Sequence, residues 1–363
     1  MSNVINLTFP SRSEQRAASI AALLGTFATH RRQDGDVFWM KENAEILNIL
    51  ECTGQPVPRD ALVAYEEFHD SIEERLEFFP QYYRFLLSMC QDLESLGIGG
   101  AKSRRLARWI ADEGLVEAEL SDLQRGEAVR LLTRVSVNPG VDVTPINDRL
   151  KSFASRSATF AVPNKKAAYE LTHIVFYLSE YGRRDPGLGA DVVQSLKFSG
   201  TLAFLDCNFD LLAEVLVAMS YCGAASPQVW KDAVANSTAR FAVAEGEDAV
   251  LQDDYHEYLV CNWALSEAGA RPFQAPLRPG PVSFHAAPRA ATPLRELSEV
   301  MHALSARRSA DWTGMRDYLF ESVSPENADI LLNAETACDC FEDFFAGFAR
   351  TGMRRPAHGV MTA

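Results

Sequence analysis

The chain has 363 residues, of which 47% are hydrophobic and 23% charged, and its formal net charge at pH 7 is -14. This composition is typical of a folded globular protein and unlike that of a disordered chain. The excess of acidic side chains argues against general binding to nucleic acids or to anionic membrane surfaces.

The first 16 residues lack the basic and apolar regions of a secretory signal, and no stretch approaches the roughly 18 to 20 apolar residues of a membrane span. We therefore expect a cytoplasmic, acidic protein. Apolar residues then recur at helical spacing in residues 17–27, 46–50 and 78–87. These segments predict an N-terminal helical region over residues 1–160.

The central region, residues 161–268, has three stronger helical patterns, in residues 166–182, 209–222 and 253–265. Strand-like stretches are limited to residues 160–162 and 282–284, and no hairpin pattern is evident. The prediction is an all-α, multi-helical fold with little or no β-sheet, either an α/α-toroid-like array or a helical bundle.

Six prolines interrupt residues 269–293, because proline lacks an amide donor and clashes with the preceding helical turn. We interpret this segment as a linker or a wrapping arm. Residues 294–363 follow as short C-terminal helices and a frayed tail. The four regions could still form one domain.

The helix predicted near residues 166–182 carries Glu170, His173, Tyr177 and Glu180 at spacings of three and four, so that they share one face. Aromatic residues flank this face, which is unusual for a face in solvent and indicates a cleft or an interior contact. A histidine that bonds a carboxylate only to join helices is the competing interpretation.

Two further helices supply possible companions. Glu214 is the only charge within an apolar helix and needs a partner, with Asp210 one turn before it. In the third helix, Asp253 precedes His256 by three residues. We expect His173, Glu214 and His256 to converge if these helices form a site.

Two kinds of metal centre would use these residue types. Glu170, His173, Glu214, Asp253 and His256 resemble the carboxylate and Glu-x-x-His pattern with which ferritin-like bundles hold two iron ions. A single zinc ion held by one of the histidines, a carboxylate and a cysteine is the alternative. The cysteine would be Cys222 or Cys261.

Two other motifs are weaker candidates. The glycine-rich segment 96–102 resembles a turn that presents amides to phosphate, but a single copy in an acidic chain is more typical of a turn between helices. Cys338 and Cys340 are separated by Asp339 and have no histidine nearby, which disfavours zinc binding. The seven cysteines do not form a disulfide pattern.

The central motif from Leu171 to Gly182 contains Leu-Thr-His and then Phe-Tyr-Leu-Ser-Glu-Tyr-Gly, and Asp210, Glu214 and His256 follow later in the chain. Together these residues resemble the pattern of a bacterial family of helical proteins without an established activity. Residues 36–45 also match its pattern. The paired helices are similar to α/α toroids, whose inner helices line a central cavity. Lanthionine cyclases and protein prenyltransferases hold zinc in that cavity, but their cysteine-containing ligand sets have no clear match in this chain.

The leading hypothesis is a polar central cavity that binds a small molecule or a metal, iron or zinc, and that could be catalytic. His173, Tyr177, Glu180 and His256 are the candidate catalytic residues, whereas Asp210 and Glu214 are candidate binding residues. A non-enzymatic interaction or scaffold protein with a protein partner is the alternative, and a ferritin-like di-metal oxidase is the second alternative. The substrate and the oligomeric state do not follow from the sequence.

Overall fold

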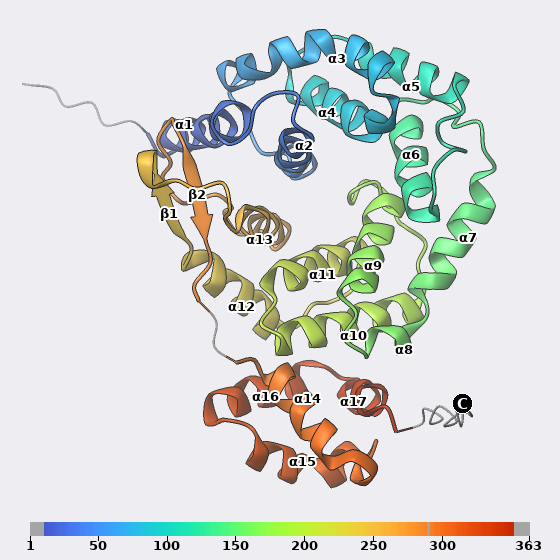
Figure 1. Ribbon diagram of the computed structural model, residues 1–363, viewed down its shortest axis with the longest axis vertical. Coiled ribbons are helices and arrows are strands. Elements are labelled where there is room, and N and C mark those ends of the chain that lie inside the picture. The colour runs from blue at the N-terminus through green and yellow to red at the C-terminus, as the bar shows by residue number, and fades with distance from the viewer. Residues whose placement is uncertain (1–10, 289–290, 352–363) are drawn as a thin grey trace, which may run out of the picture.

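The computed structural model describes residues 11–288 and 291–351, and most of these residues lie in helices (Figure 1). The helices are Arg12–Gly25 (α1), Val37–Cys52 (α2), Glu66–Phe78 (α3), Tyr83–Leu96 (α4), Lys102–Asp112 (α5), Asp122–Arg134 (α6), Val143–Ala154 (α7), Ser157–Phe160 (α8), Lys165–Leu178 (α9), Ala190–Leu205 (α10), Phe209–Tyr221 (α11), Gln228–Ala239 (α12), Tyr255–Glu267 (α13), Pro293–Leu304 (α14), Trp312–Ser322 (α15), Pro325–Ala337 (α16) and Phe341–Ala349 (α17). The predicted all-α fold is confirmed. The predicted frayed tail lies, after residue 351, outside the described residues.

Six helices form a closed inner ring in the order α2, α4, α6, α9, α11 and α13. Each packs against the next, and α13 packs against α2, which closes the ring. Figure 1 shows α1, α3, α5, α7, α10 and α12 on the outside of this ring. The arrangement is that of an α/α toroid, in which alternate helices face the centre.

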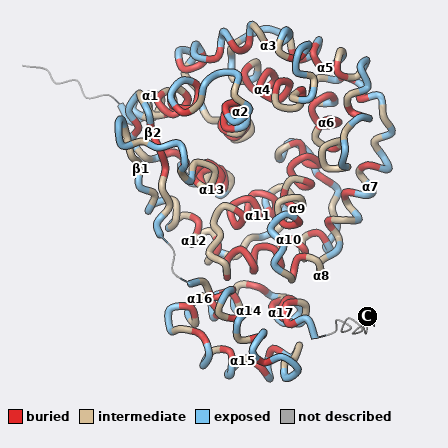
Figure 2. Tube along the Cα trace, in the orientation of Figure 1, coloured by how far each residue is buried: buried red, intermediate tan, exposed pale blue. Residues whose placement is uncertain are grey.

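Burial distinguishes the inner helix α11 from the outer helix α5, whereas the outer helix α10 is also mostly buried because α14 and α16 cover it. The inner helix α11 has nine consecutive buried residues, 211–219, whereas the outer helix α5 has only four buried positions on one face. A helix that is apolar on most sides is stable only when other helices surround it. Figure 2 shows the exposed residues mainly on the outer helices.

Side-chain caps fix where two of the inner helices begin. Asn164 accepts a hydrogen bond from the amide of Ala167 at the start of α9, and Asn208 accepts one from the amide of Leu211 at the start of α11. These bonds satisfy amides that have no partner within the first helical turn. They set the register in which α9 and α11 present their polar side chains.

Two strands, Ala242–Glu245 (β1) and Val282–His285 (β2), pair in antiparallel fashion. The strand-like pattern at residues 282–284 is confirmed, but β1 was not predicted, and the suggested strand at residues 160–162 is wrong. Phe160 is the last residue of α8, and a turn follows it. Isolated β-propensity is a weak guide where helix packing decides the local structure.

The proline-rich segment lies against the N-terminal helix. Ser19 donates a hydrogen bond to the carbonyl of Ala275, and Thr26 donates one to the carbonyl of Gly280. The segment therefore runs along the outside of the ring before the chain enters the last four helices. Helices α14 and α16 pack against α10, and α16 also contacts α12.

The predicted helix 166–182 is shorter than expected, because α9 ends at Leu178. Glu180, Tyr181 and Gly182 all have positive φ angles and form a tight turn. An added Cβ at Gly182 would lie 2.5 Å from the ring of Tyr221, so both the backbone and the space favour glycine there. Part of the Tyr-Leu-Ser-Glu-Tyr-Gly motif is thus explained by this turn.

In the described part of the chain, every helix is too short or too polar to cross a lipid bilayer.

Candidate functional site

The centre of the ring contains a cavity of about 320 Å³. All six inner helices contribute polar side chains to its wall. One from each helix, in ring order, gives Glu45, Arg84, Arg130, His173, Glu214 and His256. A volume of this size lies at the lower end of the range of small-molecule sites.

The polar cluster of this cavity is centred on His256. Its Nδ1 lies 2.6 Å from Glu45 Oε1, and its Nε2 lies 3.5 Å from Asp210 Oδ1 and 3.8 Å from Glu214 Oε1. The side chains come from α2, α11 and α13, so segments far apart in the sequence meet here. One ligand atom each from Asp210, Glu214 and His256 lie within 4.8 Å of one another.

Glu214 links this cluster to the second histidine. Its Oε2 accepts a hydrogen bond of 2.5 Å from Thr172 Oγ1 and lies 3.8 Å from His173 Nδ1. His173 Nδ1 also lies 2.7 Å from the carbonyl oxygen of Tyr169. Because a carbonyl only accepts, Nδ1 carries the proton, and Nε2 of a neutral His173 is left as the basic nitrogen.

The surroundings shift the pKa values of Glu214 and His256. Burial raises the pKa of Glu214, and the nearby histidines only partly oppose this effect. Burial alone would lower the pKa of His256, but the attraction of Glu45 and the hydrogen bonds to Asp210 and Glu45 outweigh it, and the pKa is raised well above its usual value. Glu45 and Asp210 thus favour a positive charge at the position of the His256 ring.

The opposite part of the wall combines a buried arginine with aromatic rings. Arg130 Nη1 donates to Glu180 Oε1 at 3.2 Å, and the guanidinium carbon lies 4.8 Å from the ring centre of Tyr181 and 5.8 Å from that of Tyr177. These distances allow cation–π contact. The turn after α9 is what brings Glu180 and Tyr181 to this position.

The structure brings together most, but not all, of the sequence-predicted site residues. His173, Tyr177, Glu214 and His256 line the cavity, and Asp210 lies beside His256. Glu180 does not continue the helical stripe, because α9 has ended, and it pairs with Arg130 instead.

Glu170 and Asp253 lie outside this cluster. Glu170 lies 3.9 Å from Lys166 one turn earlier on α9. Asp253 precedes α13, and its side chain is fully buried. Both of its carboxylate oxygens bind Arg31, and one of them also accepts a hydrogen bond from the amide of Phe284. The structure therefore does not assemble the five-residue set suggested for two metal ions.

Neither cysteine considered for a single zinc ion lines the cavity. Cys261 is buried, with its Sγ 3.7 Å from the carbonyl oxygen of Phe209, and Cys222 follows the end of α11. The cluster around His256 contains oxygen and nitrogen ligands without sulfur.

Sequence reasoning missed several polar cavity residues, Arg84 and Glu127 among them, and two of these, Glu45 and Arg130, take part in the contacts described above. Glu45 lies in the segment 36–45 that was noted for its resemblance, on a helix where most neighbours are buried. A charged residue within a buried inner helix was the available signal for both positions. The sequence does not say which distant helix such a residue faces.

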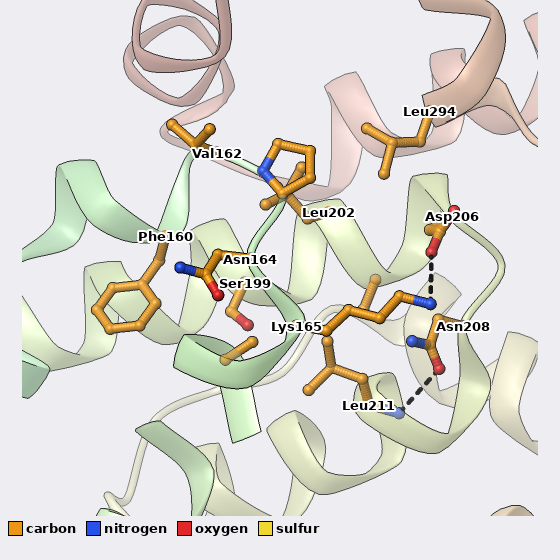
Figure 3. A pocket seen from close by; sticks show the side chains of 13 residues that line it. Phe160, Val162, Asn164, Lys165, Ser199, Leu202, Asp206, Asn208, Leu211 and Leu294 are labelled. Atoms are coloured by element: carbon orange, nitrogen blue, oxygen red, sulfur yellow. Dashed lines mark hydrogen bonds and ion pairs between the residues drawn. The ribbon is translucent and has the colours of Figure 1, made fainter. Parts of the chain in front are cut away.

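Two other places in the structure resemble sites but have simpler explanations. A cavity of about 40 Å³ between α8–α11 and Leu294 is too small for a metabolite (Figure 3). At the glycine-rich turn, Glu94 Oε1 accepts the amides of Lys102 and Ser103 at the start of α5. This carboxylate occupies the anion position that a phosphate would need.

Comparison with known proteins gives one match. The family model described as "Domain of unknown function (DUF6902)" matches residues 1–351. No curated protein and no solved structure matches the chain. The expected membership in a helical family without an established activity is confirmed.

Proposed function

This chain belongs to the DUF6902 family, and we propose that it binds a divalent transition-metal ion and a small polar molecule together in the cavity of its helical ring. Asp210, Glu214 and His256 are the proposed metal ligands. Glu45 orients His256, and His173 provides the base beside the metal. The proposed activity is that of a metal-dependent enzyme.

The observation that carries this proposal is the convergence of Asp210, Glu214 and His256 within 4.8 Å at a cavity wall. Metal-binding histidines usually donate their second ring nitrogen to a carboxylate or a carbonyl, which fixes the ring. His256 has this arrangement through Glu45. Two carboxylates and one imidazole suit manganese, iron or zinc.

The role of His173 follows from its hydrogen bond to the carbonyl of Tyr169. That bond holds the tautomer in which Nε2 is basic, within a cavity that leaves the side chain 36% exposed. A bound divalent ion would supply Lewis acidity to a substrate oxygen or to water. His173 Nε2 would accept the proton released there.

A metal-free acid–base site is the second candidate. Glu45 lies 2.6 Å from His256 and in this respect resembles the carboxylate that orients a catalytic histidine. Under this alternative Glu214 and His256 exchange a proton with the bound molecule, and no metal is required.

Metal analysis of protein purified without a chelating tag tests the leading proposal, followed by calorimetric titration of the metal-free protein with Mn²⁺ and Zn²⁺. We expect one equivalent to bind, and His256→Ala to abolish this binding. His302→Ala is the matched control, because His302 is exposed on α14. A variant His256→Ala that keeps the full stoichiometry would overturn the assignment.

Other outcomes separate the alternatives. Absence of metal binding, combined with stabilisation of the protein by a small molecule that His256→Ala removes, would favour the acid–base site. If His173→Ala and Glu214→Ala lower stability but neither metal nor small molecule binds the native protein, the scaffold hypothesis is favoured.

A further inference from the structure

The turn between α16 and α17 brings two cysteines into contact. Cys338 follows the last residue of α16, and Cys340 precedes the first residue of α17. Their Sγ atoms lie 3.3 Å apart. Cys338 is buried, whereas Cys340 is partly accessible.

The intervening Asp339 is already engaged. Both of its carboxylate oxygens bind Lys197 Nζ of α10, at 2.7 and 2.8 Å. A structural zinc ion takes four ligands, and with the carboxylate bound to lysine the turn offers only two sulfurs. The geometry therefore favours chemistry between the two thiols over metal binding.

The two thiols are electronically unequal. The pKa of Cys338 is lowered to about 6, mainly because the Cys340 thiol donates a hydrogen bond to the Cys338 thiolate, although burial opposes the shift. The pKa of Cys340 is raised, and the same hydrogen bond is the main cause. Near neutral pH the pair therefore holds one thiolate, which is the reactive form of cysteine.

Three of the other cysteines, Cys52, Cys90 and Cys222, differ in this respect. Burial raises the pKa of Cys222 to about 11, and burial also raises the pKa of Cys52 and of Cys90. Thiols with raised pKa values are poor nucleophiles at neutral pH. Reactivity toward disulfides is thus expected to concentrate at the turn between α16 and α17.

We propose that Cys338 and Cys340 form a reversible dithiol–disulfide site that reacts with low-molecular-mass disulfides of the glutathione type. The pair attacks the oxidant through one thiolate, which forms a mixed disulfide and releases one thiolate of the oxidant. The second cysteine then loses its proton and attacks the bound sulfur, which closes the bond between Cys338 and Cys340 and releases the second molecule of reduced thiol. Starting from one thiolate and one thiol, the two cysteines lose two electrons and one proton, and the oxidant gains them and leaves as one thiolate and one thiol.

This site is independent of the proposed metal centre. It lies between α16 and α17, and Lys197 connects it to the outer helix α10. Formation of the disulfide would bring the sulfur atoms from contact to bonding distance. The turn between α16 and α17, which contacts α10 through Asp339, would then carry a covalent constraint that depends on the redox state.

Peptide mass analysis of the whole protein tests the proposal directly. Trypsin cleaves after Arg316 and Arg350, and the peptide of residues 317–350 contains Cys338 and Cys340 as its two cysteines. Reduced protein is incubated with oxidised glutathione, quenched with acid, alkylated and digested. We expect this peptide to lose two hydrogen atoms and to resist alkylation, and a small dithiol reductant to reverse the change.

Two variants make the outcome specific. Cys340→Ser should stop at the mixed disulfide, so that glutathione remains on Cys338, because the second thiol is missing. Cys222→Ser is the matched control, since Cys222 is also partly accessible, and it should leave the oxidation of the 317–350 peptide unchanged. The rate of oxidation should rise with pH through about 6 and then level off.

The proposal is overturned if both thiols of the peptide remain alkylatable in native protein at equilibrium with excess oxidised glutathione. It is also overturned if wild-type protein accumulates the mixed disulfide, or if either cysteine pairs with one outside the peptide. Loss of metal binding in the cavity would not affect any of these measurements.

Discussion

Replacement of Glu45 by glutamine isolates the electrostatic part of the proposed metal site. Glu45 Oε1 contacts His256 Nδ1 at 2.6 Å, and its side chain is only 16% exposed. Glutamine can still accept the hydrogen bond from Nδ1 through its amide oxygen, but it removes the negative charge that makes the imidazole a stronger ligand. The ring orientation should therefore survive while the affinity falls.

The expected loss is about ten-fold to 100-fold in metal affinity, the usual effect of changing such an outer carboxylate, or about 1.4 to 2.8 kcal/mol. Glu45→Gln should lie near the lower limit, because the hydrogen bond is retained. Glu45→Ala should lie near the upper limit, because the ring then loses its acceptor as well. Calorimetric titration of the metal-free proteins with Zn²⁺ measures both differences at one pH.

Glu170→Gln is the matched control, because Glu170 carries the same group but faces Lys166 outside the cavity. It should bind Zn²⁺ as the native protein does. Equal affinity in Glu45→Gln, Glu45→Ala and the native protein would refute the idea that Glu45 supports a metal-binding histidine. An equal loss in Glu170→Gln would instead indicate a general charge effect.

Three further predictions concern the fold around the site. Asp253→Ala should lower the free energy of unfolding by about 3 kcal/mol, because the buried Arg31 loses two hydrogen bonds to Asp253 and keeps Glu42 as its carboxylate partner; chemical denaturation measures this, and metal affinity should not change in the folded protein. Gly182→Ala should cost about 2 to 5 kcal/mol, since φ is +80° and the new methyl group would meet the ring of Tyr221; thermal unfolding would show it. Glu51→Gln should cost about 1 to 3 kcal/mol at neutral pH, because the side chain that joins two arginines loses its charge and one of its two acceptor oxygens; its stability should also depend less on pH below 4.5 than that of the native protein.

The direction of the pH dependence predicted for Glu51→Gln follows from the cause of the pKa shift of Glu51. Burial alone would raise the pKa of Glu51, but Arg134 and Arg183 outweigh it and lower the pKa from its usual 4.5. A lowered pKa gives stability that is present above 4.5 and is lost as the pH falls through the folded-state value. The free energies of unfolding of the native protein and of Glu51→Gln, measured by denaturation at several acidic pH values, should therefore approach each other as the pH falls.

Controls for the other two variants come from the same chain. Gly223 has a φ of +65° with nothing near its Cβ position, so Gly223→Ala should cost only the backbone part, about 1 to 2 kcal/mol. An equal cost for both glycine variants would contradict the close approach of Tyr221. For Asp253→Ala, a loss of metal affinity in correctly folded protein would contradict its assignment as a partner of Arg31.

The helices themselves were largely determined by the sequence. Apolar residues at helical spacing, and a lone carboxylate at Glu214 in an apolar helix, depend only on local order along the chain. They were sufficient to predict an all-α protein and to select α9, α11 and α13 as helices that place polar groups at the cavity. Local signals end at the helix termini, which is why Glu180 was placed on a helix that stops at Leu178.

Only the tertiary structure decided which residues line the cavity. Asp253 begins the predicted helical segment 253–265 and Glu45 lies just before the segment 46–50, yet one carboxylate binds Arg31 and the other binds His256. Which of them reaches His256 depends on how α2 closes the ring against α13, a contact between segments more than 200 residues apart. Residue type and spacing fix the chemistry that a side chain can perform, whereas the closure of the ring selects the partners with which it performs it.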